Sequence, residues 1–386
     1  YAESRDGIRW TKPVLQMFSY KGSDRNNILF RQIGSKALGN RSRVHGTGVF
    51  IDTHASPKAR YKAVGQGLFV RPGQRPHRIA GMYSADGLKW TRLPKPIIDV
   101  FADSQYSGFW DASRKRYVVY SRVGGRGRSL GRSESADFAR LEPLKLVAQT
   151  SDRDPPNSDL YNSAALKYAH APNVYLMFPS LFQHGPDTLD IRLAVSRDGI
   201  RWSRPDRKTA FIALGKGNVF DSGSLYMGQG MIRVGDELWL YYSGSPLRHQ
   251  GAELENLTKP ENARVYSRVV ARLDRFVAAT AGPKGGSFTS PPLRFAGNRL
   301  HLNVRVRSGG RMRIGLLDAE GRPLPKFSVS ECVPITGDSL SKAVEWKGGS
   351  DVGARATKPT RLRIEMSDAR LFGFQFRSGK SQGKTR

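Results

Sequence analysis

One seven-residue pattern occurs three times in this chain and constrains its fold more than any other feature. The pattern Ser-x-Asp-Gly-x-x-Trp stands at Ser4–Trp10, Ser84–Trp90 and Ser196–Trp202, with a degenerate copy at Ser135–Leu141. The aspartates, at positions 6, 86, 137 and 198, lie 80, 51 and 61 residues apart. These intervals are too irregular for a tight solenoid and suit the blades of a β-propeller. We therefore expect one β-sheet unit repeated around an axis.

Each Asp-Gly pair suits a tight turn at the outer edge of a sheet. Glycine tolerates the positive φ of such a turn, and the aspartate carboxylate can accept backbone N–H bonds inside it. The tryptophan that follows is expected to fold back between neighbouring sheets. We interpret Asp6, Asp86 and Asp198 as turn residues and not as catalytic residues.

Runs of apolar residues separated by turn signals lie between these heptads and predict the strands of four complete blades. The predicted strands are 47–52, 60–65 and 77–83, then 107–111, 116–121 and 129–133, then 163–168, 174–178 and 189–195, then 231–234, 237–243 and 266–276. Residues 1–13 are interpreted as the last strand of a first blade, whose other strands we expect upstream of Tyr1. The prediction is an all-β chain with a five-bladed β-propeller over residues 1–281, its first blade incomplete.

A glycine-rich break at Gly282–Gly286 separates this region from a second one. Beyond the break, short segments alternate apolar and charged residues, as in a sheet with one buried face. We expect a β-sandwich over residues 287–377. The basic stretch 378–386 is expected to be a disordered tail.

The formal net charge of +30 is the strongest deviation in composition. Lysine and arginine are dispersed, which favours a general compositional bias over attraction to an anionic polysaccharide, and both over specific nucleic-acid recognition. No apolar run reaches the roughly 20 residues of a membrane span. We expect an exported protein, periplasmic or extracellular, although no signal peptide is visible in this sequence. The sequence leaves the oligomeric state open.

Polar residues ahead of the predicted innermost strands are the candidates for a functional site. His45, Asp103, Asp159 and Asp221 lie 58, 56 and 62 residues apart, which places them at equivalent positions of successive blades. Hydrolysis of a glycosidic bond needs one carboxyl group that holds a proton and one that is ionised. Asp103, Asp159 and Asp221 are therefore predicted to be catalytic. The alternative is that each aspartate ties the preceding turn to its strand.

The remaining candidates are predicted to bind substrate. Residues 245–263 form a polar insertion of the kind that often makes a functional rim loop. The predicted substrate-binding residues are His45, Gln105, Trp110, Tyr161, Asn162, Tyr226, His249, Glu253 and Glu255.

Signatures of metal and cofactor sites are weak. Cys332 is the only cysteine, which excludes an intramolecular disulfide and a cysteine-rich zinc site. The run Gly124–Gly127 lacks the lysine and the following helix of a phosphate loop. We predict no cofactor and no metal site, although a calcium ion held by water and a few oxygens in the propeller channel is compatible with the sequence.

The heptads, together with Asp103–Asp111 and Asp221–Met227, resemble the five-bladed propellers of glycoside hydrolase families 32 and 43. The chain is more closely similar to uncharacterised planctomycete-type proteins of the family-32-like group, which carry a C-terminal β-sandwich. Leu176–Pro179, Asp190–Asp198 and Trp346–Asp351 carry that likeness, which covers most of residues 1–377.

The resemblance implies catalysis by two aspartates and a glutamate on the first three blades. Asp103 resembles the stabilising aspartate in its context. His45 stands where the second blade's aspartate is expected, and Asp159 or Asp221 would have to replace the glutamate.

Two functions follow from these residues. The preferred hypothesis is a glycosidase that cleaves a poly- or oligosaccharide. The alternative is a carbohydrate-binding propeller without catalysis, suited to anionic glycans. A sialidase is ranked lower, because sialidase Asp-boxes carry an additional residue between Asp and Gly and no arginine triad can be located in the sequence.

Overall fold

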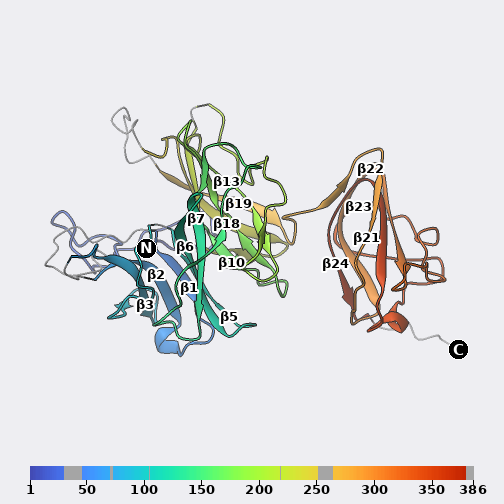
Figure 1. Cartoon of the computed structure of the whole chain (residues 1–386), viewed down its shortest axis with the longest axis horizontal. Coiled ribbons are helices and arrows are strands. Elements are labelled where there is room, and N and C mark those ends of the chain that lie inside the picture. The colour runs from blue at the N-terminus through green and yellow to red at the C-terminus, as the bar shows by residue number, and fades with distance from the viewer. Residues whose placement is uncertain (30–45, 70–72, 104, 218, 251–263, 380–386) are drawn as a thin grey trace. The chain divides into compact units, whose positions relative to one another are not determined.

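The structure is a computed structural model of the chain and describes residues 1–29, 46–69, 73–103, 105–217, 219–250 and 264–379. This part of the chain is all-β (Figure 1), with no α-helix and with 3-10 turns at η2 (Pro57–Ala59) and η5 (Gly353–Arg355). None of its helical segments is long and apolar enough to cross a membrane. The chain divides into two compact units, one of residues 1–232 and 239–269, the other of residues 233–238 and 270–386.

Three four-stranded antiparallel sheets form most of the first unit (Figure 1). The first contains β1 (Gly48–Ile51), β2 (Tyr61–Leu68), β3 (His77–Ser84) and β4 (Thr91–Arg92). The second contains β5 (Ser107–Asp111), β6 (Arg116–Gly125), β7 (Gly127–Ser135) and β8 (Lys145–Ala148). The third contains β10 (Ala165–Lys167), β11 (Tyr175–Met177), β14 (Ala194–Ser196) and β15 (Trp202–Ser203). Strands of each sheet follow one another in chain order, as expected of propeller blades.

A further sheet has the order β17-β18-β16-β13-β12-β9, with β19 also paired to β18. Its strands are β9 (Ser158–Leu160), β12 (Ser180–Gln183), β13 (Thr188–Ile191), β16 (Ser224–Met227), β17 (Ile232–Val234), β18 (Glu237–Ser245) and β19 (Val265–Arg272). Strands β12 and β13 lie between β11 and β14 in the chain and pair with each other. The hairpin that runs from β11 to β14 therefore belongs to two sheets. Its base, β11 and β14, pairs in the third sheet, and its tip, β12 and β13, pairs in this further sheet.

The first strands of the sheets lie beside one another and are joined by buried hydrogen bonds. The amide of Tyr106 donates to the carbonyl of Gly46 over 2.9 Å, and the hydroxyls of Ser107 and Ser163 are 2.8 Å apart. Gln229, beyond β16, donates from Nε2 to the carbonyl of Gly108 over 2.6 Å. These bonds connect β1, β5, β10 and β16, which belong to four different sheets.

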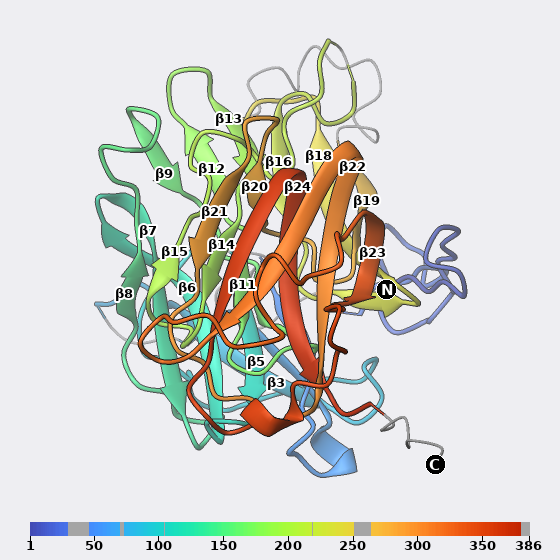
Figure 2. The same cartoon turned by 90° about the vertical axis from the view of Figure 1, so that its right-hand side faces the viewer.

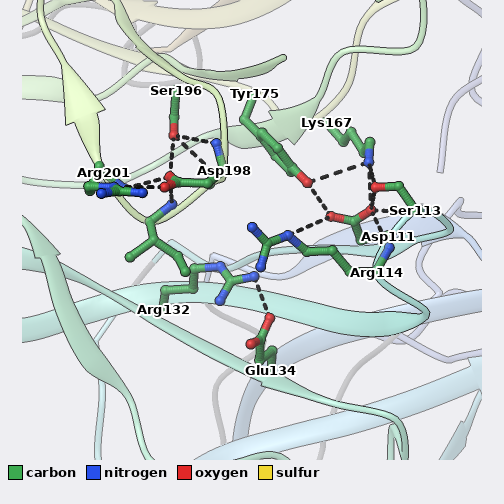
Figure 3. A network of polar contacts seen from close by, with 12 residues as sticks. Asp111, Ser113, Arg114, Arg132, Glu134, Lys167, Tyr175, Ser196, Asp198 and Arg201 are labelled. Atoms are coloured by element: carbon green, nitrogen blue, oxygen red, sulfur yellow. Dashed lines mark hydrogen bonds and ion pairs between the residues drawn. The ribbon is translucent and has the colours of Figure 1, made fainter. Parts of the chain in front are cut away.

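The Asp-Gly heptads form the predicted turns. Oδ1 of Asp198 accepts the amides of Ile200 and Arg201 at 2.9 and 2.8 Å (Figure 3), and the copies at positions 6 and 86 do the same. Gly199 has a φ of +71°, a value that favours glycine. The prediction that these aspartates hold turns is confirmed.

Two of these turns receive the same contact from a tyrosine of another sheet. Tyr120, on β6, donates from its hydroxyl to the carbonyl of Gly199. Tyr241, on β18, donates to the carbonyl of Gly7 over 2.9 Å, and its ring meets Trp10 edge-on with the centroids 5.5 Å apart. The heptad at residues 4–10 thus lies against β18 as the heptad at residues 196–202 lies against β6.

A second repeated contact involves an aspartate at the end of an innermost strand, a feature that sequence reasoning missed. Asp111, fully buried at the end of β5, accepts hydrogen bonds from the Tyr175 hydroxyl and from Nζ of Lys167 (Figure 3). Asp52, directly after β1, likewise accepts the Tyr117 hydroxyl over 2.8 Å. In both cases the tyrosine comes from the next sheet along the chain, so the aspartate joins adjacent sheets.

The second unit is built on one five-stranded antiparallel sheet, part of which is seen face-on in Figure 2. Its strands are β20 (Ala279–Ala281), β21 (Gly286–Thr289), β22 (Arg299–Leu317), β23 (Gly337–Ala343) and β24 (Arg361–Arg377). The long strands β22 and β24 pair along most of their length, with a register shift between Val306 and Arg311. Alternate residues of β22 and β24 enter one apolar core with Cys332 and Trp346. The indole N–H of Trp346 donates a hydrogen bond to the Ile314 carbonyl over 2.9 Å.

Candidate functional site

Tyr161 lies at the centre of a cluster of charged and aromatic side chains in the first unit. The guanidinium carbon of Arg122, on β6, lies 4.0 Å from the centroid of the Tyr161 ring, and that of Arg128, on β7, lies 5.4 Å from it. Nε and Nη2 of Arg122 also donate to the Tyr161 carbonyl at 3.2 and 3.1 Å. The ring and the backbone of Tyr161 therefore hold Arg122 in place.

Two of the three predicted catalytic aspartates join this cluster through the arginines. Nη1 of Arg122 is 3.0 Å from Oδ2 of Asp103, and Nη1 of Arg128 is 2.8 Å from Oδ2 of Asp159. Nε2 of His184 lies 2.9 Å from the same oxygen of Asp159. The structure thus brings together two carboxylates that are 56 residues apart in the sequence.

A tyrosine and a histidine complete the cluster. The Tyr226 hydroxyl lies 2.8 Å from Nδ1 of His249. Both rings meet Tyr161, with centroid distances of 5.9 Å for Tyr226 and 4.6 Å for His249. Arg264, just before β19, places its guanidinium carbon 5.1 Å from the centroid of the Tyr226 ring. Tyr226 and His249 are therefore placed in the cluster, as their predicted role in substrate binding requires.

At Gly127 the backbone lies very close to the carboxylate of Asp159. This residue turns the β6–β7 hairpin with a φ of +68°, and a Cβ atom added to it would lie 1.9 Å from Oδ1 of Asp159. Only glycine satisfies both conditions. The run Gly124–Gly127, which looked like a weak phosphate loop in the sequence, is the tip of a hairpin that carries Arg122 and Arg128.

Burial and positive charge set the protonation of the histidine and tyrosine. Burial lowers the pKa of His249 below its usual value, and the nearby charges of Arg128, Arg122 and Arg264 lower it further against an opposing effect of Asp187. Burial raises the pKa of Tyr226 to about 12. At neutral pH the imidazole is therefore neutral and the phenol keeps its proton.

Asn162 and Gln105 lie at the edge of the cluster. Nδ2 of Asn162 donates to Oε1 of Gln105 over 2.5 Å, and Oδ1 of Asn162 accepts the Ser180 amide over 2.8 Å. Asn162 is almost completely buried, so its amide orients Gln105 and has little surface left for a ligand.

The other predicted site residues lie apart from this cluster or outside the described residues. Asp221 accepts the Tyr242 hydroxyl at 3.1 Å, and a Cβ atom at Gly244 would lie 2.7 Å from its Cβ. Trp110 stacks on His54, with the centroids 4.2 Å apart, and packs on the apolar core to which β2, β3 and β6 contribute. His45, Glu253 and Glu255 fall outside the described residues.

Several residues of the cluster were not predicted from the sequence. Arg122, Arg128, His184 and Arg264 lie on or next to the tips of long hairpins, whose convergence has no local sequence signal. Asp154, in the Arg-Asp-Pro run at 153–155, is buried and paired with Arg204 and Arg207, so it holds its loop in place. Among the residues that the structure describes, no group of three or more His, Cys, Asp or Glu side chains is placed to hold a metal ion.

Comparisons with known proteins give structural likeness only. No protein-family model matches the sequence, and no curated protein matches it with significance. A putative glycosidase from Bacteroides thetaiotaomicron is similar at 17% identity and a TM-score of 0.39, covering 59% of this chain and 68% of that one.

Two further solved structures are similar to parts of the chain. One concerns the GH130 family of mannoside phosphorylases, described as containing glycoside hydrolases that target β-1,2 mannosidic linkages in Candida mannan; it shares 15% identity at a TM-score of 0.42 and covers 59% of this chain and 66% of that one. The other is an N-acetylgalactosamine deacetylase from F. plautii, with 14% identity, a TM-score of 0.33 and coverage of 59% and 89%. The chain spans about two thirds of the length of the two glycosidase-type structures.

Proposed function

We propose that this protein binds a glycan at the Tyr161 cluster and hydrolyses one of its glycosidic bonds. The observation that supports this is the pair of carboxylates, Asp103 and Asp159, bound by Arg122 and Arg128, whose guanidinium groups both lie near the Tyr161 ring. Carboxylates and guanidinium groups bind sugar hydroxyls through charge-assisted hydrogen bonds. Hydrolysis further requires an ionised carboxylate beside the reacting carbon.

In this proposal Asp159 takes a proton from the attacking water, while Asp103 stabilises positive charge that develops on the sugar. The glycosidic C–O bond breaks as the water oxygen bonds to the anomeric carbon. The departing oxygen takes a proton from Tyr226, which keeps its proton at neutral pH because its pKa is raised to about 12. Solvent then restores both groups: Asp159 releases its proton to water, and Tyr226 regains a proton through His249, 2.8 Å away.

A second candidate function is glycan binding without catalysis. Each of the two carboxylates already accepts a hydrogen bond from an arginine, 3.0 Å away at Asp103 and 2.8 Å away at Asp159. Carboxylates that are engaged in this way can serve as fixed acceptors for sugar hydroxyls and take no part in proton transfer.

We also propose that the first unit is a five-bladed propeller related to families 32 and 43. The contact of Tyr241 with Gly7 repeats that of Tyr120 with Gly199, which supports residues 1–13 as part of the blade that follows β16–β19 around the ring. The long strands β22 and β24 around one core support a β-sandwich in residues 287–377. An exported location fits a protein that acts on polysaccharide and remains part of the proposal.

The test uses the whole chain and a panel of neutral and charged glycans. Release of reducing ends and calorimetric binding are measured for the wild type and for Asp159→Asn, Asp103→Asn and Asp221→Asn. We expect release to fall at least about a hundredfold in Asp159→Asn while binding persists. Asp221→Asn serves as the comparison, because Asp221 contacts Tyr242 and not the cluster. Binding by the wild type without release would favour the second candidate, and neither binding nor release would reject both.

A further inference from the structure

We propose that the glycan bound at this cluster carries a carboxylate or sulfate group, and that Arg264 and Arg128 bind that group. This inference rests on the proposed function and names its substrate class. It does not depend on whether the glycan is hydrolysed or only bound.

Three guanidinium groups converge on two tyrosine rings that touch each other. Arg122 and Arg128 lie 4.0 and 5.4 Å from the Tyr161 ring centroid, and Arg264 lies 5.1 Å from that of Tyr226. The centroids of the two rings are 5.9 Å apart. Arg128 is also 5.2 Å from the centroid of Phe182. The aromatic rings thus pack against the arginine side chains and position their guanidinium groups.

The three arginines differ in how many of their N–H groups donate hydrogen bonds. Arg122 donates through all three of its nitrogens, from Nη1 to Asp103 and from Nε and Nη2 to the Tyr161 carbonyl. Arg128 donates through Nη1 to Asp159, and none of the described residues accepts a bond from its other nitrogens. Arg264 is exposed and has no ion-pair partner within the described part of the chain. Among the residues that the structure describes, Arg128 and Arg264 therefore keep N–H groups that donate to no acceptor.

The described carboxylates near the cluster do not accept hydrogen bonds from these remaining N–H groups of Arg128 and Arg264. Asp103 and Asp159 are bound by Arg122 and Arg128. Asp187, behind His249, accepts the amide of Gln250 with Oδ2 at 2.9 Å. Arg264 has no such carboxylate among the described residues, so a bound anion would compensate its charge. Planar N–H forks match the oxygens of a carboxylate or a sulfate in bidentate geometry.

The protonation of His249 responds to the same three arginines. The positive charges of Arg128, Arg122 and Arg264 contribute to the lowered pKa of this histidine, after burial. Three positive charges thus act on His249, against the one opposing charge of Asp187. An anionic group bound to Arg264 would offset that field and raise the pKa of His249 again.

The test compares matched ligands that differ only in charge. Wild-type protein is titrated with a uronic-acid oligosaccharide and its carboxyl-reduced form, and with a sulfated oligosaccharide and its desulfated form. The uronate and sulfate pairs distinguish the two sources of negative charge, and inorganic sulfate alone serves as a probe for a site that needs no sugar. We expect one charged glycan to bind about tenfold more tightly than its neutral form.

Arg264→Gln is expected to remove that preference while binding of the neutral glycan persists. Arg197→Gln is the matched control, because Arg197 is exposed on the Ser196–Trp202 turn and its loss lowers the net charge by the same amount. His249 is followed by NMR, and its pKa is expected to rise on binding of the charged ligand.

Equal binding of charged and neutral glycans, or equal losses in Arg264→Gln and Arg197→Gln, would overturn the inference and leave the proposed function intact. Binding of inorganic sulfate as tightly as the sulfated glycan would also overturn it. Failure of every glycan to bind would reject the proposed function together with the inference.

Discussion

Nη1 of Arg128 lies 2.8 Å from Oδ2 of Asp159, and the two side chains differ sharply in exposure, at 35% for the arginine and 7% for the aspartate. A buried carboxylate depends on the partners that reach it, because it has lost most of its hydration. Arg128 can meanwhile present its remaining N–H groups to solvent or to a ligand. The pair therefore links the stability of the β6–β7 hairpin to the chemistry of the candidate site.

Arg128→Ala should destabilise the first unit, because it leaves the Asp159 carboxylate with His184 alone. The expected loss is about 1–3 kcal/mol in the free energy of unfolding, measured by urea denaturation. Arg126→Ala is the control on the same hairpin. Arg126 pairs with Asp152, and both side chains are exposed, at 58% and 87%, so a loss of at most ~0.5 kcal/mol is expected. Equal losses in the two variants would show that the Arg128 pair contributes no more than a surface pair.

Gly127→Ala should distort the site without changing any of its charges. The added methyl group would meet Oδ1 of Asp159 at 1.9 Å, and alanine disfavours the φ of +68°. We expect a loss of about 1–3 kcal/mol in stability and weaker glycan binding. Gly124→Ala is the matched control, because nothing lies within 4 Å of its Cβ position. If both variants bound glycan like the wild type, Asp159 would not be needed in its present place.

The protein should lose stability in acid because the carboxylate of Asp111 becomes protonated. Burial alone would raise the pKa of Asp111, but hydrogen bonds from Lys167, Tyr175 and Ser113 outweigh it and lower the pKa to about 2 from 3.8. The native state therefore binds fewer protons than the unfolded state in this range, and the contribution is complete above about pH 5 and lost as the pH falls toward 2. Its size is about 2 kcal/mol.

The measurement is the free energy of unfolding of wild type and Asp111→Asn between pH 6 and pH 2.5. The difference between the two proteins should shrink as the pH falls. A constant difference across this range would show that the charge of Asp111 contributes nothing and that only its shape matters.

Tyr241→Phe should loosen the N-terminal heptad if residues 1–13 close the ring as proposed. The change removes the 2.9 Å hydrogen bond to the Gly7 carbonyl and keeps the ring that meets Trp10. We expect a loss of about 1 kcal/mol and faster amide exchange at residues 8 and 9. Tyr120→Phe, which removes the equivalent bond to Gly199, should instead affect exchange at residues 200 and 201. Unchanged exchange at residues 8 and 9 would argue against the ring closure.

Local turns and strands could be predicted from the sequence because their signals are local. The Asp-Gly pairs encode a carboxylate and a positive φ within three residues, and the turns at Asp6, Asp86 and Asp198 form as expected. Strands such as β3 and β6 were predicted from their apolar runs to within a few residues at most boundaries. The turn chemistry and the alternation of side chains are sufficient for these features.

The site could be predicted only in part because it depends on where hairpin tips meet. Asp103 lies in the segment before β5, whereas Asp159 lies on β9 and pairs with Phe182 of β12, so their positions in the sequence did not reveal how the two carboxylates meet. Nothing near Arg122 or Arg128 indicates that β6 and β7 extend far enough to reach those carboxylates. The tie between Asp111 and Tyr175 was missed for the same reason, since its partners are 64 residues apart.

His249 should make stability depend on pH in the range where the unfolded state gains a proton. The pKa of His249 is lowered from 6.5 by burial first and then by the three arginines. Below about pH 6.5 the unfolded chain binds a proton at this position that the native state does not, so stability falls as the pH decreases toward 5. The measurement is the free energy of unfolding of wild type minus that of His249→Gln, which should decrease between pH 7 and pH 5. The same difference for His170→Gln, at an exposed histidine, is the control. A difference for His249→Gln that stayed level would mean that neither burial nor the charges of the three arginines lowers the pKa of this imidazole.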